Sequence, residues 1–178
     1  MLSLAAPTLQ AIVAENVVFF AVACAILAVG VMRYRGTAAF PGPVTPWPMW
    51  FQVWFRVIWI AGFLLPLGTL VTFGFLPGDG AVILALTPYF VMFIVQIASE
   101  QYVWKAHASP IWVAVPALYL PWRLWQVVRG LQVMEPYPHQ TFVTYTLWVL
   151  FILWIINVGV HYTGIPASMR YPAHKTVT

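Results

Sequence analysis

Few side chains in this sequence could do chemistry, and those that could lie within or beside long apolar stretches. Gln96 and Glu100 stand four residues apart, which places them on one face of a helix. Arg56 opens another apolar stretch at a matching depth, so we expect an Arg56–Glu100 pair. This pair has two interpretations: it packs two helices together, or it forms a ligand, proton or headgroup site. An ionisable side chain in hydrocarbon is costly enough to suggest a function.

A second set of polar side chains occupies the first and last apolar stretches. Asn157 and His161 are again four residues apart, and Glu15 with Asn16 lies at what we expect to be a matching depth. We therefore predict a second polar cluster of Glu15, Asn157 and His161. The alternative is that these side chains meet water and headgroups at the membrane interface.

The same residues limit the cofactors. His161 is the only histidine inside an apolar stretch, so a haem held by two histidines is not expected. A chlorophyll held by a single ligand, His161, Gln96 or Glu100, is chemically allowed, and carotenoid or bound lipid could accompany it. The single Cys24 excludes a disulfide framework and a zinc spacing of cysteines. We predict no metal site and no catalytic residue, because nucleophile elbows, phosphate loops and paired carboxylates are absent.

Composition determines the class of protein. The chain has 178 residues, of which 62% are hydrophobic and 17% aromatic, while only 7% are charged. A soluble domain carries roughly 25% charged residues, and the mean hydropathy here is +0.87. The chain is therefore an integral membrane protein. A soluble enzyme and a nucleic-acid-binding protein are excluded, despite the net charge of +4.

Four stretches are long and apolar enough to cross a bilayer, which requires about 20 residues. We predict one transmembrane domain over residues 1–178 with spans at about 11–32, 57–75, 81–98 and 142–161. The fold class is all-α, with four transmembrane helices and one membrane-surface amphipathic or re-entrant helical segment.

That surface segment covers residues 110–134. Its apolar part is short and is interrupted by Pro116 and Pro121, each of which removes a helical hydrogen bond. Polar residues then recur three apart, at Arg123, Gln126 and Arg129, as in an interfacial amphipathic helix. We predict that the segment lies on or dips into the membrane face. A fifth crossing is the alternative.

Charge orients the spans, because basic residues favour the cytoplasmic side. With four crossings one side carries six basic residues and the other side, with both chain ends, carries two. The six are Arg33, Arg35, Arg56, Lys105, Arg123 and Arg129, and the two are Arg170 and Lys175. A fifth crossing also gives six against two, so charge does not choose between these topologies. In both, the first span begins on the non-cytoplasmic side.

Small residues and prolines add packing information. Ala14, Ala21, Ala25 and Ala28 place small side chains on one face of the first span, where a second helix could approach closely. This face could pack inside the chain or against a partner. Pro66 and Pro88 interrupt the second and third spans, and such prolines mark either kinks or transport sites.

A family resemblance extends over about two thirds of the chain. It rests on spaced residues: Ala39-Phe40-Pro41, Phe63-Leu64-Leu65-Pro66, Thr87-Pro88-Tyr89-Phe90, Gln96, Glu100, Ser109-Pro110, Val115-Pro116, Tyr119 and Arg123. In these the chain resembles an uncharacterised family of small multi-pass membrane proteins from plants, algae and related photosynthetic lineages. The family typically has a second arginine beside the one matching Arg123, and this chain does not, so an anion-binding role is not carried over. The resemblance implies four spans with a surface helix, a photosynthetic, thylakoid-type membrane, and no known reaction.

We therefore expect a non-catalytic accessory or structural subunit of a larger membrane complex, with a photosynthetic complex as the expected setting. Its expected partners are membrane lipids and the other subunits. We expect no enzymatic activity and no nucleic-acid partner. The alternative is a small dimeric transporter or lipid-handling protein, with Arg56, Gln96 and Glu100 lining its cavity. Arg123 is expected beside these three residues, in a polar cluster at the face that we favour as the functional or assembly surface.

Overall fold

The computed structural model describes residues 7–33, 49–106 and 110–168, and all regular structure in these ranges is helical. The longest elements are α1 (Leu9–Arg33), α4 (Gly80–Gln101), α5 (Ala114–Met134) and α6 (Thr141–Ser168). The shorter ones are α2 (Met49–Trp59), η1 (Ile60–Leu64), α3 (Leu65–Thr69), η2 (Leu70–Phe75), η3 (Tyr102–Ala106) and η4 (Pro110–Val113).

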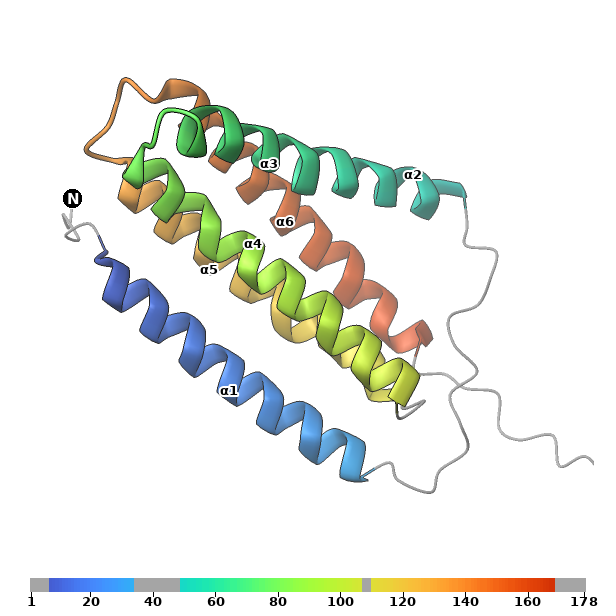
Figure 1. The fold of residues 1–178 in the computed structure, drawn as a ribbon. Coiled ribbons are helices and arrows are strands. Elements are labelled where there is room, and N and C mark those ends of the chain that lie inside the picture. Colours follow the sequence, from blue (N-terminus) through green and yellow to red (C-terminus); the bar gives the residue numbers. More distant parts are fainter. Residues whose placement is uncertain (1–6, 34–48, 107–109, 169–178) are drawn as a thin grey trace, which may run out of the picture.

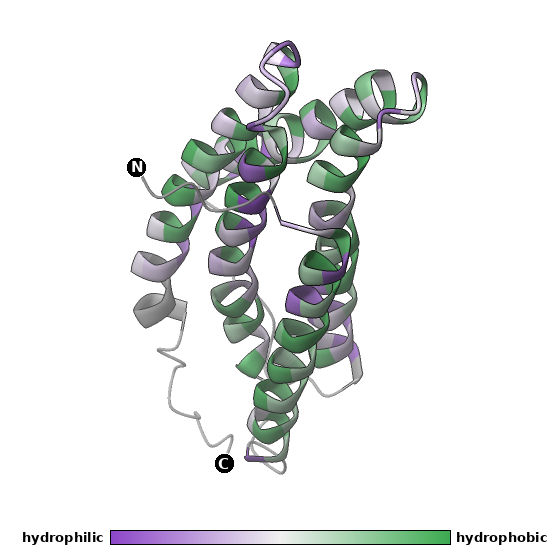
Figure 2. Ribbon diagram, turned by 90° about the vertical axis from the view of Figure 1, so that its left-hand side faces the viewer, coloured by the Kyte–Doolittle hydropathy of each residue, from purple (hydrophilic) through white to green (hydrophobic). Residues whose placement is uncertain are grey.

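The predicted fold class is confirmed: four helical stretches are long and apolar enough to cross a membrane, and a fifth helix accompanies them. The four are Leu9–Arg33, Met49–Phe75, Gly80–Lys105 and Thr141–Thr163. The chain is thus a multi-pass membrane protein. Figure 2 shows hydrophobic residues along most of the helical length, with hydrophilic residues at the turns and in short stretches within the bundle.

Two turns lie at the same end of the bundle, which we call the turn end. The first precedes α4, where the Asp79 side chain accepts hydrogen bonds from the backbone N–H groups of Ala81 and Val82 at 2.9 and 3.2 Å. The second precedes α6, where the Gln140 amide donates to the other Asp79 carboxylate oxygen at 2.8 Å. Helices α4 and α6 therefore begin side by side and run in the same direction (Figure 1).

Helix α5 runs back between them along its whole length (Figure 1). Near the turn end, a Cβ on Gly130 would lie 3.0 Å from the Ala85 carbonyl oxygen, which is tighter than most Cβ contacts, so glycine favours this close approach. Further along, the Tyr119 hydroxyl lies 3.1 Å from the hydroxyl of Ser99. The expected position of residues 110–134, on or dipping into the membrane face, differs from this observed one. Helix α5 instead connects the far end of α4 to the beginning of α6.

The reason lies in length and in burial. A helix of 21 residues rises about 31 Å, close to the roughly 30 Å hydrocarbon thickness, although its prolines and polar residues lower its hydropathy. The faces of α5 that carry Arg123 and Gln126 are covered by other helices, which leaves the two side chains 3% and 4% exposed. The fifth crossing is therefore the topology that this structure supports.

The core is a four-helix bundle with one added helix. The composite span from α2 to η2, then α4, α5 and α6, surround an apolar centre that includes Leu86, Val127, Leu147 and Leu150. Helix α1 packs outside, against α4 and α5 (Figure 1).

The end opposite the turn end carries exposed basic residues, and we call it the basic end. Arg33 ends α1, Arg56 lies in the last turn of α2, within the first third of the composite span Met49–Phe75, and Lys105 follows α4; all three are exposed. Positive charge at this end favours its placement on the cytoplasmic side. Arg35, Arg170 and Lys175 lie outside the described residues. Because α6 ends at the basic end, α1 begins and α6 ends on opposite sides, which differs from the four-crossing expectation.

Two prolines expose backbone carbonyl groups, and tyrosines from neighbouring helices cover them. Proline has no N–H to donate to the carbonyl four residues earlier. The Tyr89 hydroxyl donates to the Gly62 carbonyl, four residues before Pro66. The Tyr162 hydroxyl donates to the Ala117 carbonyl at 2.6 Å, four residues before Pro121. Backbone groups without partners are costly in hydrocarbon, so these contacts make the prolines tolerable.

The direction of α6 can be tested by labelling single cysteines with a membrane-impermeant maleimide, in a chain that carries Cys24→Ala. We expect Pro77→Cys and His139→Cys to react from the same side of sealed vesicles, and Lys105→Cys from the other. Labelling of His139→Cys together with Lys105→Cys would support the surface placement of residues 110–134 instead.

The carbonyl contacts predict unequal effects of two conservative substitutions. Tyr89 is 1% exposed, so Tyr89→Phe leaves a buried carbonyl uncovered and costs about 1–3 kcal/mol of stability. Tyr162 is 44% exposed and lies one residue before the end of the apolar stretch at Thr163, where water can replace its hydroxyl, so Tyr162→Phe costs less than about 1 kcal/mol. Thermal unfolding of both variants in detergent measures the difference; equal losses would contradict this account.

Candidate functional site

The polar side chains of α5 form two clusters on different faces of the helix. The first, which we call the arginine cage, comprises Arg123, Gln96 and Glu100 with the rings of Tyr89, Phe93 and Trp154. The second, which we call the seam cluster, comprises Glu15, Asn16, Trp125, Gln126 and Arg129. Six residues separate the two arginines, a rotation of about 240° around the helix, so they face different neighbours.

Arg123 lies in the middle of α5 and is 3% exposed. Three aromatic rings surround its guanidinium carbon, Cζ, which lies 4.1 Å from the ring centroid of Phe93, 4.7 Å from that of Trp154 and 5.4 Å from that of Tyr89. Attraction between a cation and a ring face is strongest away from water. The rings therefore stabilise a charge that hydrocarbon alone would not accept.

The Arg123 guanidinium donates its hydrogen bonds to an amide rather than to a carboxylate. The Nε and Nη2 groups of Arg123 both donate to Gln96 Oε1, at 2.9 and 2.8 Å. The Gln96 amide nitrogen then donates to Glu100 Oε1 at 2.7 Å. Gln96 thus relays the charge of Glu100 to Arg123, and the three side chains form one chain of hydrogen bonds between α4 and α5.

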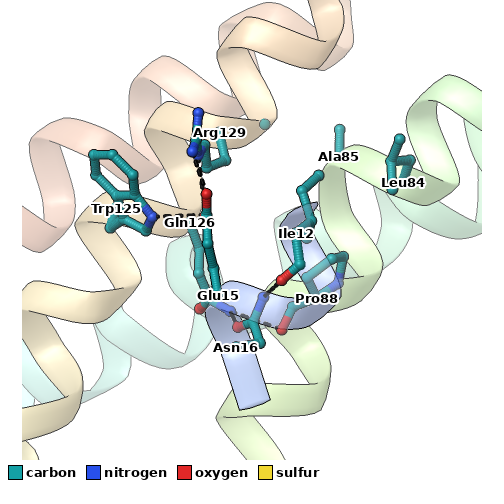
Figure 3. A pocket seen from close by; sticks show the side chains of 10 residues that line it. Ile12, Glu15, Asn16, Leu84, Ala85, Pro88, Trp125, Gln126 and Arg129 are labelled. Carbon is teal, nitrogen blue, oxygen red and sulfur yellow. Dashed lines mark hydrogen bonds and ion pairs between the residues drawn. The ribbon is translucent and has the colours of Figure 1, made fainter. Parts of the chain in front are cut away.

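The seam cluster joins α1 to α5, and Figure 3 shows its side chains. Arg129 forms an ion pair with Glu15 and donates from Nε to Glu15 Oε2 at 3.0 Å. The Trp125 ring nitrogen donates to the same oxygen at 3.0 Å. The Gln126 amide donates to Asn16 Oδ1 at 2.7 Å. Helix α1 is therefore attached to the bundle by polar contacts near the turn end.

A small cavity of about 10 Å³ lies beside the seam cluster and has room for about one water molecule. Glu15, Asn16, Pro88, Gln126 and Arg129 are among its lining residues (Figure 3). Gln126 Oε1 is buried without a hydrogen-bond partner among the described residues, so a water in this cavity would donate a hydrogen bond to it. The cavity is too small for an organic substrate.

The structure brings together three of the four residues of the polar cluster predicted to contain Glu100. Gln96, Glu100 and Arg123 are in contact. Arg56 is not with them: it is exposed on α2, and no ion pair joins it to Glu100 in the part of the chain that the structure describes. The predicted Arg56–Glu100 pair is wrong: the Glu100 carboxylate accepts a hydrogen bond from Gln96, which accepts in turn from Arg123 of α5, while Arg56 is exposed.

The second predicted cluster does not form. Glu15 lies towards the turn end, whereas Asn157 and His161 lie near the basic end of α6, where Asn157 accepts a hydrogen bond from the Trp54 ring nitrogen at 2.9 Å. The depths expected for these residues depended on four crossings. Because α5 also crosses, α6 runs in the same direction as α1, and its last residues move to the opposite end.

Sequence reasoning missed Arg129 as the partner of Glu15, and it missed the rings of Phe93 and Trp154. A signal was present for the first. A helix with polar residues on two faces has more polar surface than a membrane-surface helix needs. No sequence signal identified the rings, since aromatic residues are abundant throughout the chain.

The three proposed pigment ligands differ in whether they already have a hydrogen-bond partner. Gln96 and Glu100 are bonded to each other, so either would have to release a partner in order to hold a pigment. His161 Nε2 is buried without a hydrogen-bond partner among the described residues. No group of three or more His, Cys, Asp or Glu side chains in those residues could hold a metal ion.

Comparison of the chain with family models, with characterised proteins and with solved structures finds no match. The candidate site therefore rests on the geometry of this molecule.

The arginine cage predicts a compensating pair of substitutions. Gln96→Leu leaves the buried guanidinium without its acceptor and should cost about 3 kcal/mol of stability. Adding Arg123→Met removes the unpaired charge, and we expect it to recover at least half of that loss in thermal unfolding. Glu100→Gln, which keeps a hydrogen-bond acceptor beside Gln96, is the control and should have a smaller effect. A double variant less stable than Gln96→Leu alone would contradict the cage.

Proposed function

We propose that this chain is a non-catalytic subunit of a larger membrane complex and that it binds its partner through the outer face of α1. The observation that carries the proposal is the small-residue face of that helix. Ala14, Ala21, Ala25 and Ala28 are all exposed.

The position of this face distinguishes it from ordinary helix packing within the chain. Helix α1 buries Ile12, Ala23, Leu27 and Val31 against the bundle. At 100° per residue, the four alanines lie on the opposite side of α1. Small side chains allow the backbones of two membrane helices to approach closely. An exposed face of this kind supports association with a helix of another chain.

The interior supports the non-catalytic part of the proposal. The polar groups of the arginine cage and the seam cluster bond mainly to one another. The cavity beside the seam cluster holds no more than about one water. These features are those of packing contacts between helices rather than of a site that binds a substrate.

The proposed setting is a photosynthetic, thylakoid-type membrane, and this part rests on the family resemblance alone. Bound chlorophyll or carotenoid belongs to the same proposal, with His161 as the ligand that would need the least rearrangement.

The proposal predicts the effect of enlarging the small-residue face. We expect the wild-type chain, extracted from its native membrane in mild detergent, to migrate well above the mass of one 20.1 kDa chain in its micelle. Ala21→Leu with Ala25→Leu should shift it to the single-chain position, because leucine prevents close approach. Native gel electrophoresis and light scattering measure the mass.

The matched control is Ala98→Leu, since Ala98 is an exposed alanine on α4. It should leave the assembly unchanged. A wild-type chain that runs alone would refute the proposal. A species of twice the chain mass would favour the alternative, a dimeric transporter or lipid-handling protein. Cross-linking through Cys24, an exposed residue beside the alanine face, would identify that dimer.

A further inference from the structure

An open groove of about 660 Å³ lies between the end of α5 and the beginning of α6. Its walls include Leu131 and Gln132 of α5, Tyr145 and Trp148 of α6, and Glu135 and Thr141 beside the turn. Neither cluster of the candidate site contributes to it. The groove is also away from the alanine face of α1, and one hydrogen bond, from Arg129 to Gln132, joins the seam cluster to its wall.

The groove changes in polarity along its length. Glu135, Gln132 and Thr141 lie at the level of the turn end, whereas Leu131, Trp148 and Phe151 contribute apolar surface further along. From Thr141 to Phe151, α6 rises about 15 Å, which is half of the roughly 30 Å hydrocarbon thickness. The groove thus extends through one leaflet and has its polar end at the headgroup level. An amphiphile with a polar head and an acyl chain has this shape.

The charges at the polar end of the groove determine which lipid headgroup it favours. The Glu135 carboxylate is exposed and has no ion pair or hydrogen bond among the described residues. The guanidinium of Arg129 is paired with Glu15, and its Nη1 donates to Gln132 at 2.9 Å. The nearby positive charge is therefore already neutralised, and a negative charge is left to meet the ligand. An anionic headgroup would be repelled, and an ammonium group would be attracted.

Aromatic side chains add to this preference. Tyr145 and Trp148 are 66% and 49% exposed, and they lie about one helical turn apart on the face of α6 that lines the groove. Ring faces attract ammonium groups, including the quaternary ammonium of choline. We propose that this groove binds one zwitterionic phospholipid from the leaflet at the turn end, with its ammonium group at Glu135 and Tyr145 and one acyl chain along Trp148.

Native mass spectrometry of the full chain, titrated with dioleoylphosphatidylcholine in mild detergent, tests the proposal. We expect one lipid to be retained per chain, more strongly than dioleoylphosphatidylglycerol. Trp148→Ala should weaken retention about tenfold by removing a wall of the groove. Glu135→Gln should reduce the preference for phosphatidylcholine over phosphatidylglycerol, because it removes the charge that distinguishes them.

Two further variants keep the result decisive. Thr144→Phe adds bulk to the same face of α6 and should also reduce retention, which gives a second test if Trp148→Ala does not fold. Trp50→Ala removes an exposed tryptophan from α2 at the basic end and should change nothing. Equal retention of the two lipids by the wild-type chain, or equal losses in Trp148→Ala and Trp50→Ala, would overturn the proposal. Ala21→Leu with Ala25→Leu should retain the lipid, so this test is independent of the assembly proposal.

Discussion

Helix α5 carries charged and amide side chains that hydrocarbon does not accept uncovered, and the arrangement of the other helices follows from this constraint. Arg123 points towards α4 and α6, where Gln96 and three aromatic rings receive its guanidinium. Arg129 points towards α1, where Glu15 pairs with it. If α5 lost either neighbour, a guanidinium would meet lipid, at a cost of several kcal/mol. The polar residues of α5 therefore specify its neighbours, much as a buried polar residue specifies the partner of a coiled coil.

The backbone obeys the same constraint. A proline within a membrane helix leaves a carbonyl group without its helical donor, and in hydrocarbon no water replaces that donor. Tyr89 and Tyr162 supply hydroxyl groups to the carbonyls freed by Pro66 and Pro121. Each contact joins two helices, so the defect in one helix becomes a tertiary contact with another. Prolines that would weaken an isolated helix contribute in this way to the packing of the bundle.

Much of the fold could be predicted, and so could part of the candidate site. Apolar length identified the four candidate spans, and α6 (Thr141–Ser168) begins within a residue of the predicted position. The spacing of Gln96 and Glu100 placed them on one face, where they form a hydrogen bond. The path of residues 110–134 could not be predicted in the same way. Hydropathy scores a segment as if every face met lipid, whereas Arg123 is covered by other helices. The cost that argued against a crossing is offset by contacts that no single segment contains.

By itself, the sequence determined that this protein belongs in a membrane, where its apolar helices lie, and that α1 has a face of small residues. Those properties are local, because each depends on the composition and periodicity of one segment. Only the tertiary structure decided which polar groups meet. The depth of a residue depends on how many crossings precede it, so one additional crossing moves Asn157 and His161 to the other side of the membrane. That single change separates Asn157 and His161 from Glu15, and Glu15 forms its ion pair with Arg129 instead.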